Sequence, residues 1–455
     1  MGIPQIDSFS PTVAPCPPAP DPSTQPEWWR VIPGWSDVEP ARFRDTRWQM
    51  RHTVRSLDKL IGLTGPLLPH GFASDARGGL AVAPMELRLT PYVVSLIDWT
   101  RPWRDPIRRQ FLPLGSEVEP DHPLASLDSL NEGRDTVLPG LIHRYPDKVL
   151  FLTLDVCPVY CRCCTRSYAV GSSTDQVDKP SLSSGRSRLD DVCDYLRQHP
   201  KVVDVVISGG DTCLLPASAI RSIGERLLDL PSIRRIRFAS KLMAVLPQKV
   251  LTDEPWLDAL GYVAELGHQR GCEVALHTHV NHPREISPIT VSAAERLFER
   301  RITLRNQSVL QRGVNDDPTT MLALLRRLAE LHVRPYYVYT HDVVAGVECL
   351  RTTLARGIEI EKEIRGGLAG FDTPTFVCDV MGGGGKRDLH SYEYYDERLG
   401  IAVYRSPVVD PGRAYFYVDP LSQLSSAAQR AWQQPGAPDR FVQQALERAG
   451  MGTSH

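Results

Sequence analysis

Hydrophobic and polar positions follow two alternating patterns along the middle of the chain. Short runs dominated by apolar and β-branched residues predict strands that are buried on both faces. Longer stretches with apolar residues three or four positions apart predict amphipathic helices. The expected strands are 149–154, 202–210, 232–240, 273–280, 302–309 and 333–340, and the expected helices between them are 217–230, 255–271, 290–301 and 318–332.

Strands that alternate with helices of this length indicate right-handed crossovers and a parallel sheet. About six strands are expected and a closed barrel of this type needs eight, so the pattern predicts an α/β fold with a partial (β/α)6 TIM-like barrel. Polar residues gather where the predicted strands end, which is the edge where barrel enzymes place their chemistry. These residues are Ser208, His277, His279, Gln307, Tyr339 and Asp342.

Segments outside the barrel pattern indicate how the rest of the chain is organised. Residues 1–26 are rich in Pro, Ser and Ala, which predicts a disordered tail. Residues 27–148 carry mainly helical patterning, and the partial barrel is expected over residues 149–370. Residues 371–455 form a C-terminal segment that holds a glycine run and then mixed strand and helix.

Composition narrows the class of protein. The chain has 455 residues, 42% of them hydrophobic, which suits a packed globular protein. Its net charge is -2 and it shows no long basic face, so nucleic acid is not an expected partner. The apolar runs are too short to span a membrane, and the N-terminus lacks the features of a secretory signal. We therefore expect a cytoplasmic protein whose ten cysteines are reduced.

Four cysteines fall within the stretch CPVYCRCCTR, residues 157–166. Cys157, Cys161 and Cys164 have C-x3-C-x2-C spacing, and three thiolates can hold three irons of a 4Fe-4S cluster while the fourth iron stays open. Zinc would favour four ligands, and two adjacent cysteines rarely reach one metal, so Cys163 is interpreted as a bystander. A zinc knot, or unrelated cysteines on a buried loop, is the alternative.

A second stretch, FVCDVMGGGGKRD at 376–388, contains four consecutive glycines followed by a lysine. Glycines 382–385 let backbone amides approach an anion closely. A nucleotide P-loop would need Ser or Thr after the lysine, where this chain has Arg387. A lysine beside a phosphate cradle suits pyridoxal phosphate (PLP), whose aldehyde forms a Schiff base with lysine. From these residues alone, a simple glycine turn is an equal alternative.

The cysteine motif resembles that of the radical S-adenosylmethionine (SAM) superfamily, and together with GGGGK the chain resembles the lysine 2,3-aminomutase family. The resemblance implies a radical SAM barrel, a 4Fe-4S cluster, SAM and PLP as cofactors, and an isomerase activity in which a 5′-deoxyadenosyl radical removes hydrogen from C3 of an amino acid. It runs from about residue 86 to 400 and rests on LTPYVVSLID (89–98), PGLIHRYPDK (139–148), ISGGD (207–211), VLPQKVLT (245–252), THVNHPREI (278–286), NQSVLQRGVND (306–316), RPYYVY (334–339) and RGIEI (356–360).

The resemblance assigns cofactor roles to particular residues. Cys157, Cys161 and Cys164 match the cluster ligands, and Lys386 matches the lysine that holds PLP. The other matched positions are Gly382, Gly383, Gly384 and Gly385 beside the PLP phosphate; Arg144, Tyr145 and Lys148 in the PLP pocket, with lysine where arginine is usual; and Ser208, Gly209, Gly210, Asp211, His279 and Gln307 around SAM.

The resemblance also implies a substrate. Arg166 matches the arginine that binds the substrate carboxylate, and Asp342 and Asp379 match two aspartates that hold a distal ammonium group. Without the resemblance, Arg166 could be a surface arginine and each aspartate a helix cap. Two carboxylates favour a basic amino acid, with L-lysine first and L-arginine close behind, because carboxylates also bind guanidinium groups.

The chain departs from the family pattern at several positions. Cys163 replaces a residue that is commonly histidine, and residues 239–243 and 346–352 differ from the usual SRTP and His-Phe-Arg-Thr sequences. These changes leave the substrate open. Asp317 follows RGVND and no cysteine follows Cys378, so the structural zinc of the family is not expected.

Two other functions remain open from the sequence. The same cofactors could serve an epimerisation or an amino migration at another carbon. A non-catalytic iron–sulfur carrier or sensor is a different class, but it leaves Lys386 and the glycine run without a role. The expected partners are a small amino acid and a one-electron reductant of flavodoxin or ferredoxin type, and a homo-oligomer is expected.

Overall fold

The computed structural model describes residues 25–179 and 186–451. The predicted tail, residues 1–26, lies outside the described residues apart from Gln25 and Pro26. None of the helices in the described ranges combines the length and apolar character that a membrane crossing requires.

The centre of the molecule is one ten-stranded sheet with its strands in chain order from β1 to β10. Strands β3 to β9 are parallel, and β1, β2 and β10 add antiparallel edges. The strands are β1 (Thr136–Leu138), β2 (Leu141–Tyr145), β3 (Lys148–Leu154), β4 (Asp204–Gly209), β5 (Arg235–Ala239), β6 (Glu273–His279), β7 (Thr303–Leu310), β8 (Arg334–Thr340), β9 (Thr375–Val380) and β10 (Gly385–Asp388).

This sheet confirms the predicted α/β partial barrel. The six expected strands are β3 to β8, each within a few residues of its predicted range. The sheet also has a seventh parallel strand, β9, which pairs with β8 and which the count of six did not include. As a result the lysine-bearing strand β10 extends the barrel sheet itself.

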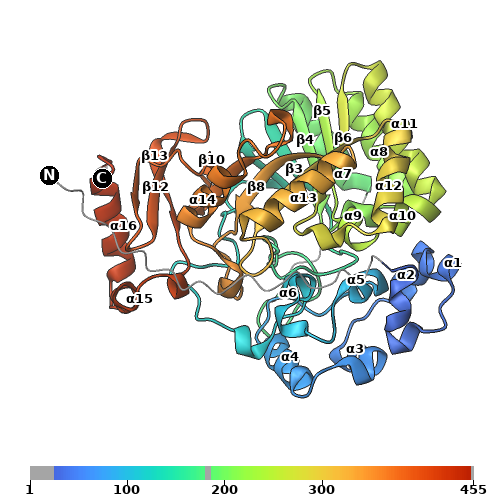
Figure 1. Cartoon of the computed structure of the whole chain (residues 1–455). Coiled ribbons are helices and arrows are strands. Elements are labelled where there is room, and N and C mark those ends of the chain that lie inside the picture. Colours follow the sequence, from blue (N-terminus) through green and yellow to red (C-terminus); the bar gives the residue numbers. More distant parts are fainter. Residues whose placement is uncertain (1–24, 180–185, 452–455) are drawn as a thin grey trace.

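Helices cover the outer face of the parallel strands (Figure 1). Asp317 caps one of them, α13, by accepting a hydrogen bond from the Thr320 amide at 2.8 Å, as short polar residues do at helix N-termini. The covering helices are α7 (Arg186–Gln198), α8 (Ala217–Leu228), α9 (Leu242–Val245), α10 (Gln248–Thr252), α11 (Glu254–Gln269), α12 (Pro288–Glu299), α13 (Pro318–Glu330) and α14 (Leu354–Ile364).

Short helices before the sheet form a layer that lies below the barrel in Figure 1. Thr90 Oγ1 donates to the carbonyl of Val245 at 2.7 Å, and Arg284 forms an ion pair of 2.9 Å with Asp105. Because Val245 and Arg284 follow β5 and β6, this layer covers the carboxyl ends of the strands. Its helices are α1 (Pro40–Phe43), α2 (Thr46–Arg51), α3 (Leu57–Thr64), α4 (Phe72–Ala81), α5 (Pro91–Leu96) and α6 (Pro106–Phe111).

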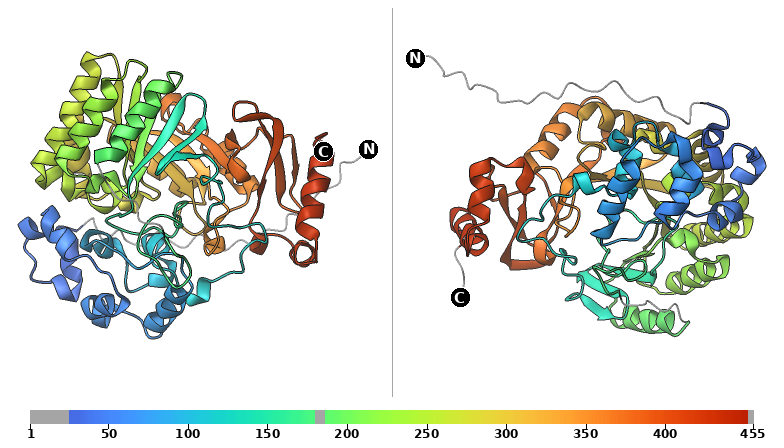
Figure 2. Two further views of the ribbon diagram at one scale, coloured as in Figure 1. Left: turned by 180° about the vertical axis from the view of Figure 1, so that it is seen from behind. Right: turned by 90° about the horizontal axis from the view of Figure 1, so that it is seen from below.

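The C-terminal part adds a second sheet of three antiparallel strands beside the barrel (Figure 2). Tyr417 of this sheet is buried and donates to the carbonyl of His341 at 2.9 Å, which joins the sheet to the chain after β8. Its elements are β11 (Tyr394–Asp396), β12 (Ile401–Ser406), β13 (Asp410–Val418), α15 (Ser426–Trp432) and α16 (Ala437–Arg448).

Candidate active site

The carboxyl ends of the parallel strands border a cavity of about 900 Å³. Its wall includes most of the residues predicted from the sequence, namely Arg144, Tyr145, Lys148, Cys157, Cys161, Cys164, Arg166, Ser208, Gly209, Gly210, Asp211, His279, Gln307, Asp342, Asp379 and Lys386. Glycines 382–385 are not among the residues that form this wall in the described chain. A large cavity with many convergent polar groups is the candidate active site.

The cysteine loop follows β3 and is held against the end of β4. The amides of Gly210 and Asp211 donate to the carbonyls of Leu154 and Val156 at 2.6 and 3.0 Å. A Cβ at Gly210 would lie 2.1 Å from the Val156 oxygen, so this close backbone approach requires glycine. The glycines therefore fix where the cysteine loop begins.

The three predicted cluster ligands lie in the wall of the cavity. Burial raises the pKa of the Cys164 thiol to about 11 and raises that of Cys157 well above its ordinary value. Neutral thiols of this kind become good ligands once a metal displaces the proton. Within residues 25–179 and 186–451, no three His, Cys, Asp or Glu side chains are grouped to hold a single metal ion.

Lys241 and Asp211 organise the side of the cavity next to the cysteines. Lys241 Nζ donates to the carbonyl of His279 at 2.8 Å and pairs with Glu285 at 3.2 Å. Asp211 accepts from the backbone amides of Cys213 and Lys241 at 2.9 and 2.8 Å. The Asp211 carboxylate is thus engaged within the chain, and it connects the ends of β4 and β5.

His279 and Gln307 project from neighbouring strands. Burial, together with the charge of Lys241, lowers the pKa of His279 well below its ordinary value, so the ring is neutral. Its Nε2 lies 3.0 Å from Asn281 Oδ1, which can only accept, so Nε2 carries the proton and Nδ1 is an acceptor. Gln307 Oε1 accepts from the Tyr336 hydroxyl at 2.9 Å, which leaves the Gln307 amide nitrogen as a donor.

Lys386 lies on β10 directly opposite Asp379 on β9. Its Nζ is 3.2 Å from Asp379 Oδ2, and its backbone amide donates to the Tyr145 hydroxyl at 2.9 Å. Burial alone would lower the pKa of Lys386, but Asp379, Tyr339 and Tyr145 outweigh it and raise that pKa well above its ordinary value. The side chain is therefore a charged ammonium against a carboxylate.

Asp342 follows β8 and faces the same region. Its Oδ2 accepts from Thr165 Oγ1 at 2.6 Å, whereas its buried Oδ1 has no hydrogen-bond partner. Asp379 Oδ1 is likewise buried without a partner. Burial and the negative charge of Asp379 raise the pKa of Asp342 to about 7. Two coupled carboxylates with unpaired oxygens create a strong preference for a cation.

Arg166 forms a bidentate pair with Glu132, which is 3% exposed. Its Nε and Nη2 donate to the two carboxylate oxygens at 2.9 and 2.6 Å, and the Tyr168 hydroxyl donates to one of them at 2.8 Å. Burial alone would lower the pKa of Arg166, but Glu132 outweighs it and raises that pKa. Glu132 is thus a site residue that the sequence did not indicate.

Arg144 and Lys148 flank the cavity close to Tyr145. Arg144 Nε pairs with Asp135 at 2.6 Å, and its Nη2 donates to the Leu130 carbonyl at 2.5 Å. Lys148 Nζ lies 4.7 Å from the centre of the Tyr145 ring, a cation–π distance. Lys148 thus lies against the tyrosine that also accepts a hydrogen bond from the Lys386 amide, and Arg144 is a second positive charge in the same cavity wall.

Gly382, Gly383 and Gly384 lie in the turn between β9 and β10, and Gly385 begins β10. A Cβ at Gly383 would lie 2.7 Å from Arg134 Nη2, one at Gly384 would lie 2.3 Å from the Tyr415 ring, and one at Gly385 would lie 2.5 Å from the Tyr145 hydroxyl. Packing leaves no room for a side chain at Gly384, whereas Gly383 and Gly385 also have positive φ, at 89° and 81°, so both packing and backbone conformation favour glycine there. The predicted contact of the glycines with a phosphate remains a prediction.

The residues that sequence reasoning missed come mainly from irregular segments. Glu132 and Thr165 contact predicted site residues, and Lys241 lies in the 239–243 segment that was noted only as a departure from the family. Tyr336 belongs to the RPYYVY motif but had no assigned role. The motif is the only sequence signal that marks Tyr336, because its hydrogen bond joins β8 to Gln307 on β7 and no local pattern indicates it.

The curated relatives that match this chain are 2,3-aminomutases. No protein-family model matches the chain. The L-lysine 2,3-aminomutase of Clostridium subterminale is 39% identical over 358 residues, which cover 77% of this chain and 79% of that enzyme. The glutamate 2,3-aminomutase of Clostridioides difficile is 29% identical over 301 residues, covering 66% of this chain and 67% of that enzyme. The solved structure of Streptococcus suis SuiB bound to S-adenosylmethionine matches with a TM-score of 0.37 and 13% identity over 52% of this chain and 51% of that chain.

Proposed function

The chain belongs to the lysine 2,3-aminomutase family of isomerases, and from that premise we propose that it moves the α-amino group of a basic L-amino acid from C2 to C3. L-Lysine is the proposed first substrate and L-arginine the second. The family uses a 4Fe-4S cluster, SAM and PLP, and the chain carries residues that suit each of them.

One structural observation supports the proposal of a basic substrate. Asp342 Oδ1 and Asp379 Oδ1 are both buried in the cavity wall without a hydrogen-bond partner. A buried carboxylate oxygen that is left unpaired is costly, and an ammonium or guanidinium group can satisfy both oxygens at once. The site therefore favours a substrate with a positive charge at the far end of its side chain.

The same observation argues against an acidic substrate. The glutamate side chain ends in a carboxylate, which Asp342 and Asp379 would repel. The relative that acts on glutamate is also less identical to this chain than the lysine enzyme of Clostridium subterminale, at 29% against 39%. We therefore place glutamate behind both basic amino acids.

The opposite end of the substrate is assigned to Arg166. Glu132 occupies Nε and Nη2 of the guanidinium, so Nη1 is the group that can reach the substrate carboxylate. The Arg166–Glu132 pair fixes the plane of the guanidinium in advance, which lowers the entropy cost of binding. In this proposal, Arg166 binds the substrate carboxylate and the two aspartates bind the positive charge at the other end. Contacts at both ends orient the C2 and C3 atoms between them.

The residues around the cysteines and Lys386 suit the cofactors chemically. Three thiols of one loop in the cavity wall fit a cluster with an open iron, and a lysine that shares this wall with two positive charges, Arg144 and Lys148, fits a phosphate-bearing aldehyde. When bound, the cluster and SAM supply one-electron chemistry that removes hydrogen from C3, and PLP supplies a conjugated carrier for the migrating nitrogen. A one-electron reductant is then required.

The protein's own contribution is positioning. His279 offers an acceptor at Nδ1 and Gln307 a donor at Nε2, so together they can hold a ligand that carries both kinds of group. The N-terminal layer closes the carboxyl ends of the strands, which limits the access of water to reactive species. Holding the reacting atoms close together in the right orientation can remove about 7–11 kcal/mol of a barrier.

The test is a product analysis with anaerobically reconstituted protein, SAM, PLP and a one-electron reductant. L-Lysine and L-arginine are supplied separately, and β-amino acids are sought by mass spectrometry. Formation of β-lysine or β-arginine supports the proposal and identifies the substrate. Cleavage of SAM without either product, or a product epimerised at C2, would overturn it.

A further inference from the structure

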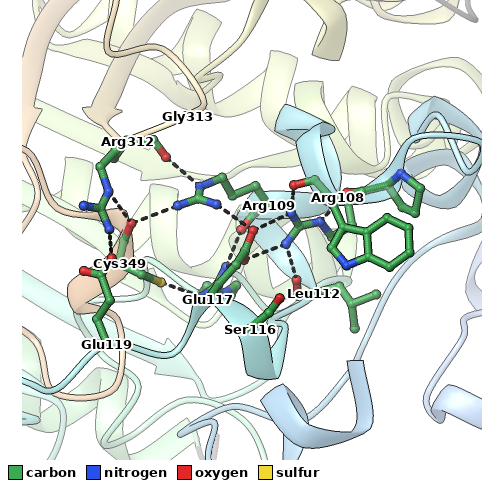
Figure 3. A network of polar contacts seen from close by, with 12 residues as sticks. Arg108, Arg109, Leu112, Ser116, Glu117, Glu119, Arg312, Gly313 and Cys349 are labelled. Atoms are coloured by element: carbon green, nitrogen blue, oxygen red, sulfur yellow. Dashed lines mark hydrogen bonds and ion pairs between the residues drawn. The ribbon is translucent and has the colours of Figure 1, made fainter. Parts of the chain in front are cut away.

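A largely buried carboxylate, Glu117, lies at the centre of an arginine network that includes Arg108 and Arg109 (Figure 3). Its Oε1 accepts from Arg108 Nη2 at 2.7 Å and from Arg109 Nη1 at 2.6 Å. Its Oε2 accepts from Arg108 Nη1 at 2.8 Å and from Arg162 Nη1 at 3.3 Å. One carboxylate thus receives hydrogen bonds from three guanidinium groups, and its side chain is only 12% exposed.

Arg162 is the member of this network that belongs to the cysteine loop, since it stands between Cys161 and Cys163. Its backbone amide donates to the carbonyl of Gln110 at 2.9 Å, and its Nη1 donates to the carbonyl of Arg109 at 3.0 Å. Both carbonyls lie in the last turn of α6, where carbonyls lack partners within the helix. The loop therefore caps α6, and α6 in turn holds the loop.

Cys349 completes the attachment from the other side. Arg162 Nη2 lies 3.0 Å from Cys349 Sγ, and the Cys349 carbonyl accepts from Arg109 Nη2 and Arg312 Nε, each at 3.0 Å. Cys349 lies in the 346–352 segment, which departs from the family sequence. Three segments that are distant in sequence, 106–117, 157–166 and 346–352, therefore meet at Arg162.

The charge of Glu117 reaches the cysteine loop through Arg162, whereas its neighbour Glu119 has no hydrogen bond or ion pair with that loop among the described residues. Burial alone would raise the pKa of Glu117, but Arg108, Arg109 and Arg162 outweigh it and hold that pKa below its ordinary value, so the group is ionised. Without this charge Arg162, whose side chain is 7% exposed, would lose its carboxylate partner. Because a buried charge without a partner is unfavourable, the Arg162 side chain would then move towards water. Glu119 pairs with Arg312 instead, which lies outside the cysteine loop.

We propose that Glu117 and Cys349 are positioning residues for the iron–sulfur cluster, because they fix Arg162 and with it the relative positions of Cys161 and Cys164. This inference rests on the proposed function, since it takes the three cysteines as cluster ligands. The N-terminal layer then has a second task besides covering the barrel, which is to hold the cluster-binding loop in shape.

The experiment compares the full-length protein with Glu117→Gln, Glu119→Gln, Cys349→Ala and Cys349→Ser after anaerobic reconstitution. Iron and sulfide per chain, the visible and electron paramagnetic resonance spectra, and the rate of iron loss to a chelator are measured, together with thermal unfolding. Glu119→Gln is the matched control, because it removes a carboxylate from the same network without a contact to the loop. Cys349→Ser retains a hydrogen-bond acceptor for Arg162.

The expected result separates cluster retention from stability. Glu117→Gln should lose iron about tenfold faster than the wild type, while Glu119→Gln stays within about twofold, even if both variants unfold at lower temperature. If Glu117→Gln does not fold, Cys349→Ala, which leaves the ion pairs in place, should still lose iron about threefold faster, and Cys349→Ser should restore retention.

Two outcomes would overturn the inference, and they differ in what else they affect. Equal iron retention in Glu119→Gln, Cys349→Ala and every folded Glu117 variant would show that Arg162 is not held for the sake of the cluster, and would leave the proposed function untouched. A wild-type protein that assembles no cluster under the same conditions would overturn the proposed function and this inference with it.

Discussion

Lys386 Nζ lies 3.2 Å from Oδ2 of Asp379, its direct partner across the ladder between β10 and β9. Lys386 is the residue proposed to hold PLP, and Asp379 is one of the two residues proposed to bind the far end of the substrate. A lysine side chain and an L-lysine substrate both present a primary ammonium on an alkyl chain. If both proposals hold, the enzyme's own lysine would compete with the substrate for one carboxylate until PLP engages its nitrogen.

This competition predicts the effect of removing the ammonium of Lys386. In protein without PLP, Lys386→Met should bind pentylammonium about tenfold more tightly than the wild type, because Asp379 is released from its internal partner. Isothermal titration calorimetry measures the difference. Asp379→Asn is the control and should weaken binding in both backgrounds. Equal affinity in the wild type and Lys386→Met would show that the internal pair does not block the site.

A second prediction concerns Asp342 and pH. Burial and Asp379 raise the pKa of Asp342 from an ordinary value of 3.8 to about 7 in the folded protein. Between these values the folded state keeps a proton that the unfolded state has released, so this contribution to stability is complete below the lower value and is lost as the pH rises through 7. The free energy of unfolding of the ligand-free wild type should therefore fall between about pH 4 and 7 relative to that of Asp342→Asn.

Denaturant unfolding at a series of pH values provides the measurement. The difference in unfolding free energy between the wild type and Asp342→Asn should change with pH in this window and become flat above it. Parallel curves for the two proteins would mean that Asp342 titrates at its ordinary value. Binding of a basic amino acid should show the opposite trend and strengthen as the pH rises, because only the ionised carboxylate attracts a cation.

The Arg166–Glu132 pair gives a third prediction, which concerns the substrate carboxylate. Replacing Arg166 alone would leave Glu132 buried and unpaired, so the double variant Arg166→Gln with Glu132→Gln is the cleaner change. It should weaken binding of L-lysine by about tenfold to a hundredfold and leave binding of 1,5-diaminopentane, which lacks the carboxylate, nearly unchanged. A loss of affinity that is equal for both ligands would contradict the assignment of Arg166.

The barrel could be predicted from the sequence because its evidence is local. Apolar runs such as 149–154 and 202–210 alternate with helical periodicity, and each of the six expected strands is present. The local pattern does not separate strand β9 from the segment after it, because β9 leads straight into the glycine turn and residues 371–455 are predicted as one C-terminal segment. Only its pairing with β8, which is a long-range contact, shows that it belongs to the barrel.

The residues of the candidate site likewise fall into those that the sequence could predict and those that it could not. The positions of Cys157, Asp379 and Lys386 in the cavity wall could be anticipated because each lies in a recognisable motif. Glu132 could not, because its partner Arg166 is 34 residues away and neither residue type nor spacing links the two. Charged residues in irregular segments acquire partners only in the folded chain, so their roles escape any reading of local pattern.

A last prediction separates two explanations of the glycine run, tight packing and conformational freedom. Gly382 and Gly385 both have positive φ, at 73° and 81°, so alanine at either position costs roughly 1–2 kcal/mol of backbone strain. A Cβ at Gly382 meets nothing within 4 Å, whereas one at Gly385 would lie 2.5 Å from the hydroxyl of Tyr145, which binds the Lys386 amide. Gly382→Ala is therefore the matched control for Gly385→Ala.

If packing against Tyr145 sets the position of Lys386, Gly385→Ala should bind PLP at least about tenfold more weakly than Gly382→Ala, although both lose similar stability from backbone strain. The absorption of protein-bound PLP during titration gives the affinity, and thermal unfolding gives the stability. Should the two variants bind PLP equally weakly, the shared loss would point to the turn conformation itself as the feature that PLP requires, and the contact between Gly385 and Tyr145 would have no part in it.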